Sequence, residues 1–256
     1  MRIRLSFTEE KGQKIILPIH YNVSIQWMIY KFLTSKLAST LHDTGYPLAD
    51  RKFKLFTFSR ILEQGIPVSI KNKRFLLFTS SFSFYLSSAM DNLLKDVLSS
   101  SLSNTTLLLN NQSITLKELT VIKDPTFSSP LLIKMESPMT TYSTFHTEDK
   151  EKRTHYYHPW SKDFSHFLHK NLLRKYAVIH QCDIPSIDDL PFHIEPFKVG
   201  KERNFSVVVY KNNPIEAWTG IYKIQGSPLL VEIGYSSGLG SKNSMGFGMW
   251  SPYEPM

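Results

Sequence analysis

His42 is a candidate for acid–base chemistry because of where it stands in the chain. It follows Leu41, the last apolar residue of an amphipathic stretch, and comes shortly before Gly45, so we expect it at the end of a helix. An imidazole at that place can face a groove and exchange protons near neutral pH. A capping role explains the same position, since helix C-termini favour cations. On these residues alone, capping has more support than catalysis.

Basic side chains are concentrated in the first half of the chain. Residues 1–120 contain 15 basic and 8 acidic side chains, whereas residues 121–256 contain 15 and 14. Two short runs carry much of the excess: Arg51, Lys52, Lys54 and Arg60, and Lys71, Lys73 and Arg74. Such a patch attracts phosphates, but lysines also keep exposed strand edges from pairing. Charge alone therefore leaves nucleic-acid binding and solubilisation equally open.

Residues 238–248 read GLGSKNSMGFG and form the densest glycine segment. Glycines allow close backbone approach or a positive φ, and exposed backbone N–H groups can bind phosphates. The candidates for contacts to phosphates or base edges are Gly238, Gly240, Ser241, Lys242, Asn243, Gly246 and Gly248. The alternative is a loop that packs two domains together. The segment is neither a Rossmann fingerprint nor a Walker A loop, because its order of elements and its lysine context are wrong for both.

The elements that position these residues follow from hydrophobic periodicity. In the first half, Arg2–Thr8 alternates like a strand, and an apolar stripe predicts a helix that Asn22 or Ser24 caps and that extends to His42. Further strands are expected at 52–58, 66–70, 74–79, 106–109 and 113–122. A second helix is expected to begin at Ser81 or Ser83. This β-α-β-β-α-β order is typical of a ferredoxin-like domain.

The second half is expected to repeat this order after a Pro125–Pro130 loop. Strands are predicted at 131–136, 192–199, 205–210, 218–224 and 247–251, and helices at 161–176 and after Ser227. The polar stretch 143–154 is expected to be a loop. The predicted fold is therefore α+β, with two tandem ferredoxin-like (RRM-like) domains at 1–124 and 125–256.

Several classes of protein are excluded by composition. Cys182 is the only cysteine, so no internal disulfide forms. No apolar run approaches the ~20 residues of a membrane span, and the N-terminus lacks the apolar region of a secretory signal. These features predict a soluble, cytoplasmic protein without a membrane partner. His166 and His169 have a helical spacing compatible with a metal, but an exposed polar helix face has more support, and no metal site is expected.

The position of the glycine-rich segment, between the last helix and last strand of a second ferredoxin-like domain, resembles that in the CRISPR-associated RAMP superfamily. Within it, the sequence is similar to the repeat-processing endoribonucleases of the sixth Cas family over nearly the whole chain. The strongest part is GLGSKNSMGFGM, followed by YKFL, LHDTGY and KLFTFS.

The resemblance implies cleavage of CRISPR precursor RNA within the repeat, without a metal or cofactor. The RNA 2′-hydroxyl would attack the adjacent phosphate and leave a 2′,3′-cyclic phosphate and a 5′-hydroxyl. It makes His42 the expected catalytic histidine and Lys54 an expected catalytic lysine, with Arg51 and Lys52 as alternatives or RNA contacts. Tyr30 matches a tyrosine that some members use.

One geometric condition applies to this set of residues. Tyr30 and His42 are 12 residues apart, which is roughly 18 Å along an unbroken helix. Both can reach one phosphate only if the helix breaks near Thr34–Ser35.

Two other functions remain open on the sequence. A non-catalytic RAMP subunit that binds guide or repeat RNA in an interference complex shares the fold and the glycine loop but does not need His42. An adaptor whose surfaces bind proteins is the second alternative. The expected partners are CRISPR repeat RNA and, in an interference complex, other Cas proteins; the sequence leaves homodimer formation open.

Overall fold

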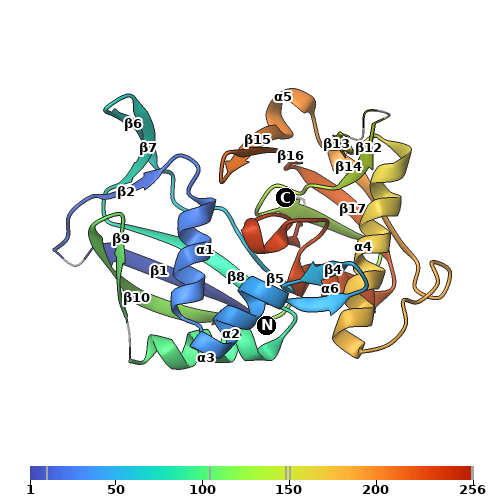
Figure 1. Cartoon of the computed structure of the whole chain (residues 1–256), viewed down its shortest axis with the longest axis horizontal. Helices are drawn as coiled ribbons and strands as arrows, with labels where there is room; N and C mark the ends of the chain where they lie inside the picture. Colours follow the sequence, from blue (N-terminus) through green and yellow to red (C-terminus); the bar gives the residue numbers. More distant parts are fainter. Residues whose placement is uncertain (10, 104, 148, 150, 255–256) are drawn as a thin grey trace.

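The computed structural model describes residues 1–9, 11–103, 105–147, 149 and 151–254. Two antiparallel sheets lie side by side, one from each half of the chain, and helices cover one face of each (Figure 1). Among the described residues, no helix is long and apolar enough to cross a lipid bilayer.

The first sheet has the strand order β5-β8-β1-β10-β9. Its strands are β1 (Arg2–Glu9), β5 (Phe56–Phe58), β8 (Ser81–Ser88), β9 (Thr106–Leu109) and β10 (Gln112–Ile122). Helices α1 (Asn22–Lys31) and α3 (Asp91–Ser101) pack on the face that presents Ile3, Leu5 and Phe7, all fully buried. Without β9, a short hairpin partner of β10, the order is that of a ferredoxin-like domain.

The second sheet repeats this arrangement with the order β14-β17-β11-β18. Its strands are β11 (Leu131–Met135), β14 (Phe192–Lys198), β17 (Ile221–Gly226) and β18 (Trp250–Pro252), and its helices are α4 (Lys162–His180) and α6 (Pro228–Ser237). In both halves the first strand lies between the third and the fourth. The prediction of two tandem ferredoxin-like folds is therefore confirmed.

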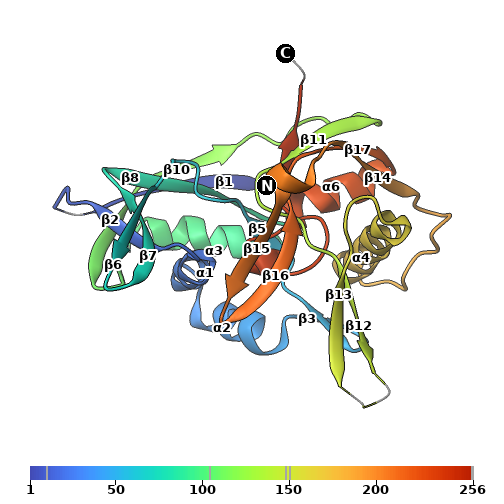
Figure 2. The same ribbon diagram turned by 90° about the horizontal axis from the view of Figure 1, so that it is seen from above.

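Smaller elements extend both halves. A three-stranded sheet contains β2 (Ile15–Pro18), β7 (Lys73–Phe78) and β6 (Ile66–Ile70). The two-stranded ribbons are β3–β4 (Tyr46–Leu48, Arg51–Phe53), β12–β13 (Tyr142–His146, Lys152–Tyr156) and β15–β16 (Phe205–Tyr210, Asn213–Trp218). Figure 2 shows the β12–β13 ribbon projecting from the second half. The remaining short helices are α2 (Ser35–Ser39), η1 (Thr40–Thr44), α5 (Lys201–Asn204) and η2 (Asn243–Met245).

Two sequence-based predictions of local structure are wrong. The segment from Ser81 forms strand β8 and not a helix, because Phe82, Phe84 and Leu86 alternate with small polar residues and are all buried. The helix begins only at Asp91. Strand β8 lies between β1 and the edge strand β5, and the 66–79 hairpin forms as predicted and is extended by β2. The stretch 143–154, predicted as a loop, contributes most of the β12–β13 ribbon; residues 148 and 150 lie outside the described part.

Two predicted details also change around the first helix. Tyr21 is the N-cap of α1, and neither Asn22 nor Ser24 caps it. The expected strand 52–58 divides into β4 and β5, and between them Leu55 has a φ of 53°. This turn leaves Lys54 between the two strands, half-buried.

Each half has its own hydrophobic core. One cluster of buried side chains runs from Ile3 to Leu116 and another from Ile133 to Trp250. The predicted boundary after residue 124 falls in the connection between β10 and β11.

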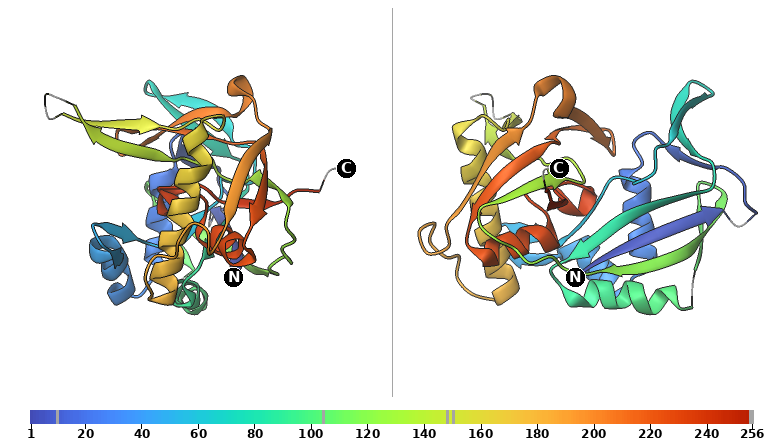
Figure 3. Two further views of the ribbon diagram at one scale, coloured as in Figure 1. Left: turned by 90° about the vertical axis from the view of Figure 1, so that its right-hand side faces the viewer. Right: turned by 180° about the vertical axis from the view of Figure 1, so that it is seen from behind.

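Arg2 joins the two halves through a buried guanidinium. Its residue is 2 % exposed, and Nη2 donates to the carbonyls of Trp250 at 2.9 Å and Tyr235 at 3.2 Å. Nη1 donates to Ser251 Oγ at 3.1 Å, and the guanidinium stands 3.8 Å from the centre of the Tyr235 ring. Figure 3 shows the start of β1 at the junction of the halves. Burial lowers the pKa of Arg2.

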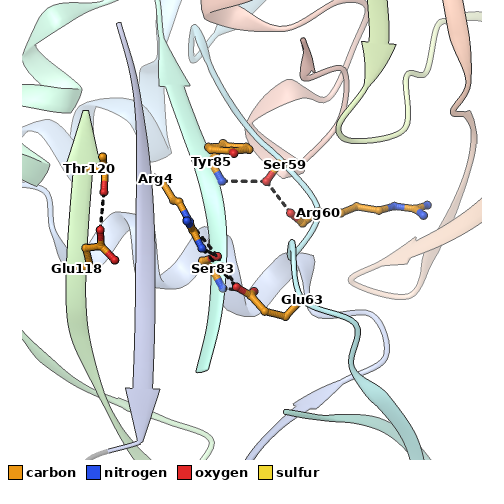
Figure 4. Close-up of polar contacts among 8 residues, drawn as sticks. All are labelled: Arg4, Ser59, Arg60, Glu63, Ser83, Tyr85, Glu118 and Thr120. Atoms are coloured by element: carbon orange, nitrogen blue, oxygen red, sulfur yellow. Dashed lines mark hydrogen bonds and ion pairs between the residues drawn. The ribbon is translucent and has the colours of Figure 1, made fainter. Parts of the chain in front are cut away.

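We expect Arg2→Met to lower the free energy of unfolding by about 2–4 kcal/mol, because it leaves buried oxygens without donors. Arg4→Met is the matched control on the same strand. Arg4 is 40 % exposed and bonds to Ser83 and Glu63 on the open face of the sheet (Figure 4), so its loss is expected to cost less than about 1 kcal/mol. Urea unfolding of both variants checks this, and equal losses would contradict the role of Arg2.

Candidate active site

The helix that carries Tyr30 ends before it reaches His42. Helix α1 stops at Lys31, and Thr34 has an extended ψ of 148° before α2 begins at Ser35. Asp96 of α3 holds this break, because its Oδ2 accepts from the Thr34 N–H at 2.9 Å and from Thr34 Oγ1 at 2.7 Å. The condition that both side chains reach one site is therefore met.

A tight turn follows His42. Gly45 has a φ of 59°, and a Cβ there would lie 2.7 Å from the Phe53 carbonyl oxygen. Glycine is thus required where β3 approaches β4. Lys52 Nζ donates to the Asp43 carbonyl at 2.9 Å and fixes the turn from the other strand.

Tyr30, His42 and Lys54, the three predicted catalytic residues, line one cavity of about 540 Å³, which we call the His42 pocket. Lys211 and Lys242 bring two further cations to it. No acidic side chain lines this cavity in the part of the chain that the structure describes. The pocket therefore suits an anionic ligand.

Asp43 determines which ring nitrogen of His42 carries the proton. His42 Nδ1 lies 2.8 Å from Asp43 Oδ1, and the His42 side chain is 73 % exposed. The hydrogen bonds from His42 and then from Ser39 lower the pKa of the Asp43 carboxyl, so it is ionised near neutral pH and can only accept. The Nδ1 nitrogen of a neutral His42 must carry the proton, which leaves Nε2 as a free proton acceptor.

Tyr30 and Lys54 form a second polar pair in the His42 pocket. Lys54 Nζ donates to Tyr30 Oη at 3.1 Å. Burial raises the pKa of Tyr30 to about 12, so its hydroxyl keeps its proton and can donate it to another acceptor. Burial, then the nearby Lys211, lowers the pKa of the Lys54 ammonium. Tyr30 is therefore a proton donor at neutral pH, and Lys54 donates a hydrogen bond to its oxygen.

The glycine-rich segment packs the two halves against each other. Its backbone carbonyls accept from the first half: Thr57 Oγ1 to Phe247 at 2.9 Å, Asn22 Nδ2 to Met245 at 2.7 Å, and Gln26 Nε2 to Ser244 at 2.6 Å. Its four predicted contact glycines, Gly238, Gly240, Gly246 and Gly248, are all buried. A Cβ at Gly246 would overlap the Phe58 ring. The packing alternative thus accounts for most of these glycines, and only Gly240 lines a cavity.

Asn243 is part of the framework of this segment. Its Nδ2 donates to the carbonyls of Leu239 and Phe247, each at 3.0 Å, and its Oδ1 accepts from Lys175 Nζ at 2.8 Å. With both ends of its amide engaged inside the protein, Asn243 supports the loop, and its contact with RNA stays a prediction.

The other predicted RNA contacts surround a second cavity beside the His42 pocket. It has a volume of about 320 Å³ and is lined by Arg51, Lys52, Ser241 and Lys242 among others. Lys242 Nζ stands 4.8 Å from the centre of the Tyr142 ring and borders both cavities. The predicted cations are thus brought together around two adjoining pockets.

Sequence reasoning missed four polar residues of this region. Asp43 adjoins His42 but had no assigned role, and Lys211 comes from the β15–β16 turn, where Lys211 and Asn212 have positive φ. A turn signal at Lys211–Pro214 could have indicated it. Lys175 and Asn171 of α4 give no local signal, because a Lys or Asn on a helix is usually exposed.

One histidine of α4, His169, has a structural role. His169 is buried, and its Nε2 lies 2.6 Å from the Leu190 carbonyl oxygen. Among the described residues, no group of three His, Cys, Asp or Glu side chains is arranged to hold a metal ion.

A family model described as CRISPR associated protein Cas6, C-terminal, matches residues 122–252, just over half of the chain. The chain belongs to the Cas6 family. Two curated relatives agree with this. The CRISPR-associated endoribonuclease Cas6 of Pyrococcus furiosus is 26% identical over 253 residues, which cover 94% of this chain and 85% of the relative. A Cas6 endoribonuclease of Methanocaldococcus jannaschii is 25% identical, with 85% of this chain and 83% of the relative covered.

Solved Cas6 structures share the whole fold. A CRISPR associated protein Cas6 superimposes with a TM-score of 0.73 at 23% identity and 99% coverage of both chains. A Cas6-related protein of Pyrococcus furiosus gives a TM-score of 0.80 at 20% identity, covering 100% of this chain and 99% of the other. The predicted Cas6 family membership, tandem fold and endoribonuclease class are therefore confirmed.

Proposed function

We propose that the protein is a metal-independent endoribonuclease that cuts CRISPR precursor RNA within the repeat and so produces guide RNAs for antiviral defence. One observation carries this proposal: a helix break brings Tyr30, His42 and Lys54 into one cationic pocket, where Asp43 leaves His42 Nε2 free to accept a proton. The names of the curated relatives support the same substrate class.

In the proposed reaction, His42 Nε2 takes the proton from a ribose 2′-hydroxyl, whose oxygen attacks the adjacent phosphorus. The Lys54 and Lys242 ammonium groups stabilise the negative charge that develops on the phosphorane. The bond from phosphorus to the 5′-oxygen then breaks, and Tyr30 donates its hydroxyl proton to that oxygen. The products are a 2′,3′-cyclic phosphate and a 5′-hydroxyl.

This assignment divides the work between the halves of the chain. Residues 1–124 supply Tyr30, His42 and Lys54, and residues 125–256 supply the glycine-rich segment with Lys242. We propose these ranges as the two domains. We also propose that the enzyme acts on RNA in the cytoplasm and that it associates with other Cas proteins or with a second copy of itself.

Cleavage of end-labelled cognate repeat RNA in excess EDTA tests the proposal. We expect full cleavage by the wild-type protein, with a cyclic phosphate end, because the pocket provides acid, base and cations from its own side chains. A 2′-deoxy substitution at the cut position removes the nucleophile and is expected to abolish cleavage. A strict requirement for a divalent ion would contradict the mechanism. Tight binding without cleavage would identify a guide-holding RAMP subunit instead.

A further inference from the structure

The second cavity, which we call the Asn171 pocket, directly adjoins the His42 pocket. Lys54, Lys242 and Met245 line both. A phosphate held between Lys54 and Lys242 would therefore have one cavity on each side. With a volume of about 320 Å³, the Asn171 pocket reaches the size range of small-molecule sites.

The walls of the Asn171 pocket are strongly cationic. Its basic lining residues are Arg51, Lys52, Lys54, Lys175 and Lys242. No acidic side chain lines it among the described residues. The half-buried ring of Tyr142 supplies an aromatic wall. Cations beside an aromatic surface are the usual surroundings of an unpaired nucleotide.

Asn171 itself lacks a partner. The residue is only 8 % exposed, and its Oδ1 is buried without a hydrogen bond to any described residue. Such an atom destabilises the protein unless something else supplies a donor. Asn171 lines the cavity, so a ligand bound there can supply the donor once the amide turns its oxygen toward the cavity. The amide carries an acceptor and a donor side by side, which matches the edge of a nucleobase.

We infer that the Asn171 pocket binds the base of the nucleotide next to the scissile phosphate, and that Asn171 reads this base by hydrogen bonds. The inference rests on the proposed function for the identity of the ligand, and it adds a residue that determines sequence specificity. Asn171 does not touch the reacting atoms, which lie on the other side of Lys54.

Binding of a panel of repeat RNAs, each with one abasic position, tests this inference without requiring cleavage. If the wild-type protein cleaves these RNAs, each RNA also carries a 2′-deoxyribose at the cut position, so that it stays intact during the binding measurement. At one position, loss of the base is expected to weaken wild-type binding by about tenfold or more. Asn171→Leu removes both hydrogen-bonding groups at similar size, so the same loss is expected to be nearly absent in this variant.

Stability provides the second readout. Asn171→Leu replaces an unpaired buried amide, so its melting temperature is expected to equal or exceed that of the wild type. Lys170→Ala, an exposed lysine on the same helix, is the matched control and is expected to keep the wild-type abasic profile. Asn171→Ser is a smaller second variant with the same expected profile as Asn171→Leu.

The outcomes separate the two proposals. Identical abasic profiles for the wild type and both Asn171 variants, or a lower melting temperature with an unchanged profile, would overturn base reading by Asn171. A wild type that discriminates but never cleaves would retain the base subsite and reject the proposed function. Cleavage in EDTA with no position that depends on Asn171 would support the proposed function and overturn base reading by Asn171.

Discussion

Replacement of His42 by alanine is expected to slow cleavage of the repeat RNA by about 10²–10⁴-fold. The reason is the geometry of the His42–Asp43 pair: the ionised carboxylate accepts a hydrogen bond from Nδ1–H and leaves Nε2 as the only nitrogen that can accept a proton from the 2′-hydroxyl. Single-turnover cleavage under saturating enzyme measures this loss directly. Binding should stay close to wild type, because five lysine and tyrosine side chains of the pocket remain.

Two further variants locate the origin of this effect. Asp43→Asn keeps the size of the side chain but removes the charge that selects the tautomer, so a smaller loss is expected. His180→Ala is the matched control, since His180 is an exposed histidine at the end of α4 and lines neither pocket. Full cleavage by His42→Ala would mean that the protein is an endoribonuclease whose general base is Lys54 or Tyr30 and not His42.

Local sequence patterns predicted the parts of the fold that depend on near neighbours. The alternation in Arg2–Thr8 gave β1 because one face is covered by two helices. Asn110 and Asn111, between the predicted strands 106–109 and 113–122, form the β9–β10 turn, and both adopt a positive φ. The helix break before Ser35 was required by the site and is present, because Thr34 bonds to Asp96 of a different helix.

Contacts between distant segments explain what the sequence could not show. Strand β8 was mistaken for the start of a helix because its small polar residues also suit a helix cap, and only pairing with β1 and β5 decides the matter. The glycines of 238–248 suggested a phosphate cradle, but Gly238 and Gly246 lie against Thr57, Phe58 and Asn22 of the other half. Contacts between segments so far apart in the chain leave no periodic pattern in the sequence.

Lys175 is another residue whose role no local sequence pattern indicates, and we expect it to affect activity. Its ammonium is completely buried, and it donates to the Gly238 carbonyl at 2.6 Å and to Asn243 Oδ1 at 2.8 Å. It therefore ties the start of the glycine-rich segment to the residue that follows Lys242. Burial lowers the pKa of Lys175 to about 7. We interpret Lys175 as a positioning residue that holds Lys242 between the two pockets.

Lys175→Met is expected to lower the cleavage rate about 10²-fold, because Lys242 loses its fixed position against the phosphate. If Lys175 acts through Lys242, the double variant Lys175→Met/Lys242→Met should be no slower than Lys242→Met alone. Independent, additive losses would contradict a positioning role. Lys170→Met, on the exposed face of the same helix, is the control and should cleave like the wild type.

The pH dependence of unfolding gives an independent signature of the buried Lys175 ammonium. The folded pKa of about 7 lies below the unfolded value of 10.5, so between these values the unfolded chain binds more protons. Lys175 therefore makes the wild type more stable as pH rises through this window, by up to about 1 kcal/mol per pH unit, and Lys175→Met lacks this contribution. Urea unfolding of both proteins at pH 7, 8 and 9 should show the wild type gaining on the variant. A constant difference would mean that the folded pKa of Lys175 stays near its unfolded value and that the ammonium keeps its charge throughout this range.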